Sequence, residues 1–144
     1  MRKFHQVLLF VLLAWLSANS GRAEQQLLFD AAWVRAMPPG MGMTAGFGQL
    51  QNVGAGTIEL VSFSSPQFGE VSLHRTELVD GVNRMRAVPS LVIVAGESVA
   101  LEPGGYHLML MMPAGPMQQG QRITVEMKAA DGRVFRFEMP VERR

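Results

Sequence analysis

Cysteine is absent from all 144 residues of this sequence. Disulfide bonds and thiolate metal sites are therefore excluded, and the stability of the fold must come from its apolar core alone. The same absence excludes a blue-copper electron carrier, which needs a cysteine thiolate, and a lipid-modified N-terminal cysteine. Any metal site in this chain must therefore use ligands other than thiolates.

A charge excess of either sign is also missing. The sequence has 13 Lys and Arg against 12 Asp and Glu, which gives a formal net charge of +1. Loss of the first 23 residues would remove Arg2, Lys3 and Arg22 and leave a charge of about −2. Such a balance does not indicate nucleic acid or an anionic membrane surface as a partner.

The first 23 residues have the layout of a secretory signal. A basic start is followed by the apolar run "VLLFVLLAWL" and then by small residues up to Ala23. The run has about ten residues, whereas a stable membrane span needs roughly 20. We expect residues 1–23 to be a signal peptide cleaved near Ala23, and residues 24–144 to be the exported mature domain. A retained membrane anchor is the alternative.

Helical periodicity is missing too, since no stretch shows an amphipathic helical pattern longer than two turns. Short runs rich in Val, Ile, Leu and Phe alternate with Gly- and Pro-containing turns, which is typical of β-strands. Asp131-Gly132 is the strongest hairpin signal. The sequence predicts a single all-β domain, a Greek-key barrel or sandwich. Its expected strands are residues 28–37, 44–51, 57–64, 71–76, 84–88, 98–101, 106–112, 121–128 and 133–140.

The mature chain has two histidines, His74 and His107, and both fall on predicted strands. In "GYHLMLMM", side-chain alternation puts Leu108 and Leu110 on the core face and sends His107 and Met109 to the opposite face. In "EVSLHRTEL", the same alternation turns His74 away from the core side. Both histidines are therefore predicted to face away from the core.

Met85 lies between two arginines in "NRMRAV" and alternates with charge instead of belonging to an apolar run. If Met85 meets His74 across a hairpin while Met109 accompanies His107, two imidazoles and two thioethers converge. Thioethers are soft donors that suit Cu(I), whereas zinc sites use Cys, His and carboxylates. Methionine is also a common core filler, so alternation alone leaves open both a copper site and a purely structural role. Packing or rim positions are the interpretation for Met112, Met127 and Met139.

The spacing from His74 to Met109, H-x10-M-x21-H-x-M, resembles the signature of the periplasmic PCu(A)C copper chaperones. The segments "AWVRAMPPG", "DGVNRMRAV" and "LEPGGYHLMLMMP" are similar to that family as well, so the resemblance extends over nearly the whole mature chain. It implies a cupredoxin-like β-domain, barrel or sandwich. It also implies one Cu(I) per chain, with His74, Met85, His107 and Met109 as its ligands.

The resemblance further implies what the protein does. It implies a metallochaperone in the periplasm, and we expect a monomer that is not an enzyme. The copper would go to the Cu(A) subunit of cytochrome c oxidase, directly or through a thiol-disulfide copper-delivery protein. Copper buffering or resistance with the same site, and a metal-free exported β-sandwich that binds a protein partner, are the alternatives. A copper enzyme is opposed by the lack of a third mature histidine and of a Ser-His-Asp or paired-carboxylate arrangement.

Some features stand apart from the family pattern. Arg75 follows His74 where many members carry a methionine at or near that position, and such a cation could lower Cu(I) affinity or steer a partner. The chain ends at "VERR", without a His/Met-rich tail. In the loop "MPPGMGM", Met37, Met41 and Met43 could form a sulfur rim beside the site. A plain Pro/Gly turn between the first two strands is the favoured interpretation of this loop.

Overall fold

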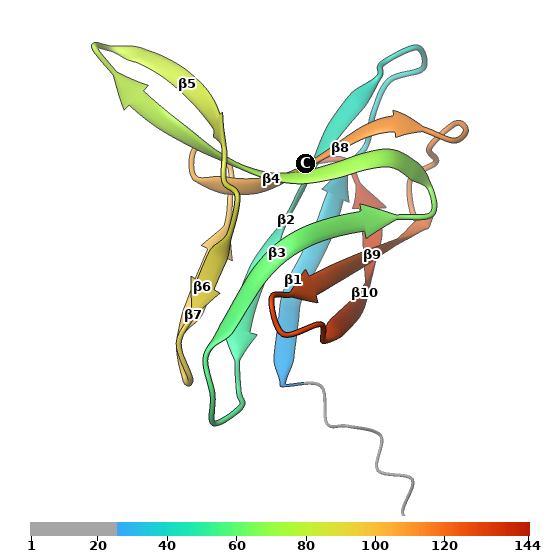
Figure 1. Cartoon of the computed structure of the whole chain (residues 1–144). Coiled ribbons are helices and arrows are strands. Elements are labelled where there is room, and N and C mark those ends of the chain that lie inside the picture. Colours follow the sequence, from blue (N-terminus) through green and yellow to red (C-terminus); the bar gives the residue numbers. More distant parts are fainter. Residues whose placement is uncertain (1–25) are drawn as a thin grey trace, which may run out of the picture.

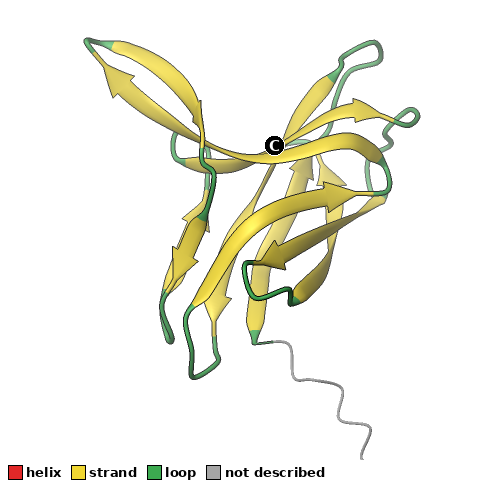
Figure 2. Cartoon of the chain, in the orientation of Figure 1, coloured by secondary structure: helices red, strands yellow, loops and turns green. Residues whose placement is uncertain are grey.

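The computed structural model describes residues 26–144, which form ten β-strands and no helix (Figure 2). The predicted all-β class is confirmed. Since the described range is free of helices, it contains none that could cross a membrane. The expected signal peptide, residues 1–23 with cleavage near Ala23, lies outside the described residues. The strands are β1 (Leu27–Arg35), β2 (Met43–Asn52), β3 (Ile58–Ser65), β4 (Phe68–Val79), β5 (Val82–Ala87), β6 (Leu91–Ile93), β7 (Ser98–Leu101), β8 (Tyr106–Pro113), β9 (Arg122–Ala129) and β10 (Val134–Glu142).

Seven strands close into a barrel-like ring (Figure 1). The hydrogen-bonded neighbours run in the order β4, β8, β2, β1, β10, β9 and β3, and β3 then pairs with β4 again. These pairs are antiparallel except for β1 and β10, which run parallel. Closure of this kind protects strand edges that would otherwise remain unpaired.

The hydrophobic core fills the inside of the ring. Along β9, Ile123, Val125 and Met127 are fully buried, and the residues between them are exposed or half-buried. This alternation follows from the two-residue period of a strand, in which successive side chains point to opposite faces. Each fully buried apolar side chain contributes about 1.5–3 kcal/mol relative to exposure. A core of this kind replaces the disulfide bonds that the sequence lacks.

Three shorter strands attach to the ring. β5 pairs with β4 at one end of the strand order, and the β4–β5 hairpin projects beyond the rest of the domain (Figure 1). β7 lies beside β2 and β8, and β6 pairs with β3. The sequence did not predict β6, because three residues between Pro- and Gly-containing turns are too few to show alternation.

The nine strands predicted from the sequence are all present, with ends displaced by at most three residues. The hairpin predicted at Asp131-Gly132 joins β9 to β10. Gly132 has a φ of 92°, a left-handed conformation that glycine adopts without steric cost, and its N–H donates to the carbonyl of Ala129 at 2.9 Å. Asp131 supports the turn by accepting the N–H of Arg133 at 3.0 Å.

Candidate metal centre

Strands β4 and β8 place the two histidines side by side. Their antiparallel register puts His74 directly opposite His107 and Ser72 opposite Met109. The two imidazole rings have centroids 6.0 Å apart and planes 25° from parallel. Since residues two apart on a strand share a face, His74, His107 and Met109 lie on the same face of this strand pair.

The β4–β5 hairpin brings Met85 to that same face. Met85 pairs directly with Thr76, which follows His74 by two residues and therefore shares its face. Met85 is 61% exposed on the edge strand. The structure thus places all four residues that the sequence predicted on one face of the β5–β4–β8 sheet. Their assignment as metal ligands stays a prediction.

His107 is buried, with 4% of its surface exposed, which the sequence did not predict. It points to the face opposite Leu108, as alternation requires. That face is covered, however, because β2 pairs with β8 along this stretch and Phe47 of β2 has its ring centroid 6.5 Å from the imidazole. His107 therefore faces away from Leu108 and Leu110, as alternation predicts, but the face that it takes is covered and is not open to solvent.

The two nitrogens of His107 have different environments. Nδ1 lies 3.2 Å from the carbonyl oxygen of Gly105, which can only accept, so Nδ1 carries the proton. Nε2 is buried and has no hydrogen-bond partner within residues 26–144. An unsatisfied buried nitrogen costs about 1–3 kcal/mol. Neutral Nε2 with a free lone pair is also an atom through which histidine binds metals.

His74 is half-buried and is oriented by its own strand. Its Nε2 lies 2.9 Å from the hydroxyl of Ser72. Burial lowers the pKa of His74 and the neighbouring His107 lowers it further, while Glu70 acts in the opposite direction. A lowered pKa favours the neutral imidazole, which is the form that binds metals.

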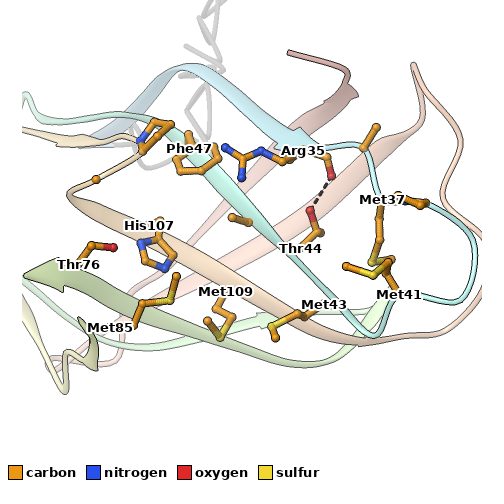
Figure 3. Close-up of a pocket in the computed structure, with 15 residues that line it drawn as sticks. Arg35, Met37, Met41, Met43, Thr44, Phe47, Thr76, Met85, His107 and Met109 are labelled. Carbon is orange, nitrogen blue, oxygen red and sulfur yellow. Dashed lines mark hydrogen bonds between the residues drawn. The ribbon is translucent and has the colours of Figure 1, made fainter. Parts of the chain in front are cut away.

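The face that carries these residues lines a pocket of about 320 Å³ (Figure 3). Met85, His107 and Met109 belong to its lining, whereas His74 does not, although its ring lies beside that of His107. In the close-up, Met85 and His107 lie at one end of the pocket and Met109 lies next to them. Three of the four predicted residues therefore meet in one cavity.

The lining continues away from His107 with two methionines of the loop between β1 and β2 and with Met43, the first residue of β2. Met37 and Met41 lie at the far end in the close-up, and Met43 lies between them and Met109 (Figure 3). The favoured interpretation of this loop as a plain turn is therefore incomplete, because all three side chains line the pocket. The three methionines are visible in the sequence, but nothing in the order of the residues indicates that the loop folds against this pocket.

The donors gathered here are soft. Within the described part of the chain, no three His, Cys, Asp or Glu side chains lie close enough together to hold a metal ion, whereas the pocket lining combines one imidazole with several thioethers. Arg35 is the charged residue of the lining, and its guanidinium carbon lies 5.1 Å from the ring centroid of Phe47. Imidazole with thioether suits Cu(I), whereas Mg²⁺ and Ca²⁺ require oxygen ligands.

Arg75 lies away from the candidate ligands. It is paired in register with Tyr106, and its guanidinium carbon lies 5.2 Å from the centroid of that ring. Because neighbouring residues on a strand point to opposite faces, this cation lies on the other side of the sheet from His74. The guanidinium of Arg75 is therefore not one of the groups on the face that carries the candidate ligands.

Solved structures with the same fold are PCuAC domains. The copper-bound PCuAC domain from PmoF2 aligns with a TM-score of 0.67 at 16% sequence identity, over 83% of this chain and 94% of that one. The solution structure of DR1885 from Deinococcus radiodurans in its Cu(I) form aligns with a TM-score of 0.65 at 31% identity, over 83% of this chain and 82% of that one. The predicted cupredoxin-like fold is confirmed by these likenesses.

Sequence comparisons identify the family. A family profile described as "Putative lipoprotein LpqE-like" matches residues 27–141. The protein named "Putative lipoprotein Lxx21020" from Leifsonia xyli subsp. xyli is 36% identical over 123 residues, which are 85% of this chain and 73% of that protein. The resemblance to PCu(A)C proteins seen in the sequence is confirmed: this chain belongs to the LpqE-like family and has the PCuAC fold.

Proposed function

We propose that this protein is an exported metallochaperone that binds one Cu(I) through His74, Met85, His107 and Met109. The observation that carries the proposal is the buried Nε2 of His107, which lacks a hydrogen-bond partner in the described chain and belongs to a pocket that Met85 and Met109 also line. DR1885, which is 31% identical to this chain, has a solved Cu(I) form. Copper is the cargo, and the protein is a carrier and not an enzyme.

The arrangement suits the holding of copper. The carbonyl of Gly105 fixes the tautomer of His107, so that Nε2 presents its lone pair. His74 supplies a second imidazole, with its ring stacked against that of His107. Thioethers are neutral and have no proton to lose, so the two methionines bind Cu(I) with less dependence on pH than thiolates would.

The arrangement also suits the release of copper. Met85 is exposed, and every residue of β5 around it is exposed as well. The β4–β5 hairpin projects from the domain, where an acceptor protein can approach it (Figure 1). A ligand from the acceptor can replace Met85 first and the less exposed ligands afterwards, so that copper is never free in solution.

We take the acceptor to be the Cu(A) subunit of cytochrome c oxidase, or a thiol-disulfide protein that acts before it. This destination rests on the resemblance to PCu(A)C chaperones. Export from the cytoplasm is supported by the word lipoprotein in the descriptions of the family and of its Leifsonia relative, whereas the periplasm as destination rests on the resemblance to PCu(A)C chaperones. A copper-buffering protein would use the same site without an acceptor.

Competition for Cu(I) tests the binding part of the proposal. The mature chain and a Met85→Ala/Met109→Ala variant are titrated anaerobically against a colorimetric Cu(I) chelator. We expect tight binding of a first equivalent by the native chain, and a loss of affinity of more than about 100-fold in the variant. Unchanged affinity in the variant would contradict the ligand assignment.

A transfer assay tests the delivery part. The Cu(I)-loaded chain is mixed with a copper-free Cu(A) domain, the two are separated by chromatography, and the copper content of each is measured. A chaperone is expected to lose its copper to the domain, whereas a buffering protein would keep it. A Met112→Leu variant, changed outside the pocket, serves as the matched control in both assays.

A further inference from the structure

The pocket contains more sulfur than the proposed site uses. Met37, Met41 and Met43 fall within seven residues and line the same cavity as Met85 and Met109. Met41 and Met43 are 53% and 52% exposed, so neither of them fills the core. Single exposed apolar residues are ordinary, but core packing does not explain why three thioethers line one cavity.

The backbone of the loop holds two of these methionines together. The N–H of Met41 donates to the carbonyl of Pro38 at 3.3 Å, and Gly40 has a φ of 85°. With Pro39 at the second position and glycine at the third, this is a type II turn. The turn reverses the chain, so that Met37 and Met41 flank it at the far end of the pocket (Figure 3).

The loop is also fixed at its return into β2. The hydroxyl of Thr44 donates to the carbonyl of Arg35 at 2.6 Å, which joins the last residue of β1 to the start of β2. The N–H of Met112 donates to the carbonyl of Gly42 at 3.0 Å and holds the loop against β8. A loop held in this way keeps its side chains near one place, which lowers the entropic cost of binding a ligand.

Met43 lies between the loop and the proposed copper site. On β2, Met43 and Ala45 share a face, and Ala45 is the direct partner of Met109 on β8. Met43 is therefore a diagonal neighbour of Met109, and such pairs are about 7–8 Å apart. The loop methionines thus lie next to the proposed ligands without being the same set.

We propose that Met37, Met41 and Met43 form a second site, made of thioethers alone, for a soft monovalent cation such as Cu(I) or Ag(I). Three neutral sulfur donors without a carboxylate or an imidazole select soft cations and exclude hard ones. This site is weaker than one that includes imidazoles, and it lies in the part of the same pocket that is farther from His107. It goes beyond the proposed function and does not require the first site to be a copper site.

Titration with Ag⁺ alone tests this second site, because Ag⁺ is soft and does not change its oxidation state. The methyl groups of all methionines in the mature chain are labelled with carbon-13 and followed by NMR. We expect the Met85 and Met109 signals to shift with the first equivalent. The signals of Met37, Met41 and Met43 are expected to shift with the second.

Three variants accompany the titration. The Met37→Leu/Met41→Leu/Met43→Leu variant is expected to bind one equivalent fewer and to keep the affinity of the first within about threefold, as for sites that share no ligand. Met85→Leu/Met109→Leu should lose the first equivalent and keep the second. Met112→Leu, an exposed methionine outside the pocket lining, should keep both.

The outcomes separate the two proposals. Loop signals that stay unmoved at two equivalents, or a triple variant with native stoichiometry, would overturn the second site while leaving the first intact. Loop signals that move together with Met85 and Met109 during the first equivalent would show one extended site and would also overturn it. If the loop signals move and those of Met85 and Met109 do not, the second site stands and the proposed function fails.

Discussion

Two groups of methionines differ in where their side chains lie. Met127 on β9 and Met139 on β10 are fully buried in the core. Met85, Met41 and Met43 are more than half exposed, yet all three line one pocket. The same residue type fills gaps among apolar neighbours in one region and presents sulfur at a cavity in the other. The position in the fold, and not the residue type, separates the methionines that pack in the core from those that line the pocket.

The core group is placed by strand pairing. Met127 lies opposite Phe135 on one side and Phe63 on the other. Met139 lies opposite Ile123, and its methyl group would be 3.0 Å from a Cβ at position 46, so glycine there leaves the room that it needs. These methionines have well-packed apolar surroundings, and no metal is needed to explain them.

The largest effect on binding is expected from His107→Leu. The change removes the unpartnered nitrogen from the pocket, and Cu(I) affinity is expected to fall by more than about 100-fold, since even loss of a supporting residue around a metal costs about 10–100-fold. The free energy of unfolding of the copper-free protein should stay within about 1 kcal/mol or rise, because an unsatisfied buried nitrogen disappears. Chelator competition and urea unfolding measure the two quantities. Native affinity in this variant would remove His107 from the site.

Substitution of a core methionine is expected to lower the stability of the fold and to leave Cu(I) binding unchanged. Met127→Ala leaves a cavity in the core and should lower the free energy of unfolding by about 2–5 kcal/mol. Cu(I) affinity and stoichiometry, measured at a temperature where the variant is folded, should be native. A loss of copper binding by the folded variant would show that the two groups of methionines are not separate.

A smaller effect is expected from Met85→Leu, for which the chain offers a matched control. Met85 and Met112 are 61% and 59% exposed, but only Met85 belongs to the pocket lining. Met85→Leu is expected to weaken Cu(I) binding by about 10–100-fold. Met112→Leu should leave the affinity native, and both variants should unfold within about 0.5 kcal/mol of the native chain. Equal effects of the two changes on binding would contradict a specific role for Met85.

The smallest effect is expected from Arg75→Ala. The guanidinium of Arg75 lies over Tyr106, on the face of the sheet opposite to His74. Exposed charges interact weakly through water, so Cu(I) affinity should change by less than about threefold. A larger change, measured by the same chelator competition, would show that this cation acts on the site.

The sequence predicted nine of the ten strands and placed the four candidate ligands on strands. Alternation was sufficient for this, because Leu108 and Leu110 identify the core face of β8 and place His107 and Met109 on the other face. The short strand Leu91–Ile93 was missed because alternation cannot be recognised in three residues. The assignment of the four residues as ligands came from their spacing and stays a prediction.

The burial of His107 could not be predicted from its own strand. Its cover comes from β2, some sixty residues earlier in the chain, where Phe47 packs towards it. Alternation states which face a side chain takes but not what lies on that face. The position of the segment Met37–Met43 also depends on the pairing of β2 with β8. That pairing cannot be recognised from the Pro- and Gly-rich composition of the segment, which by itself favours a plain turn.

Copper K-edge X-ray absorption on the mature chain with one equivalent of Cu(I) tests the central claim most directly. The account predicts a mixed ligand shell with nitrogen from His74 and His107 and sulfur from Met85 and Met109. In the Met85→Ala/Met109→Ala variant, the sulfur contribution should fall sharply. A native shell without sulfur, or a sulfur contribution that survives the loss of both methionines, would contradict the account.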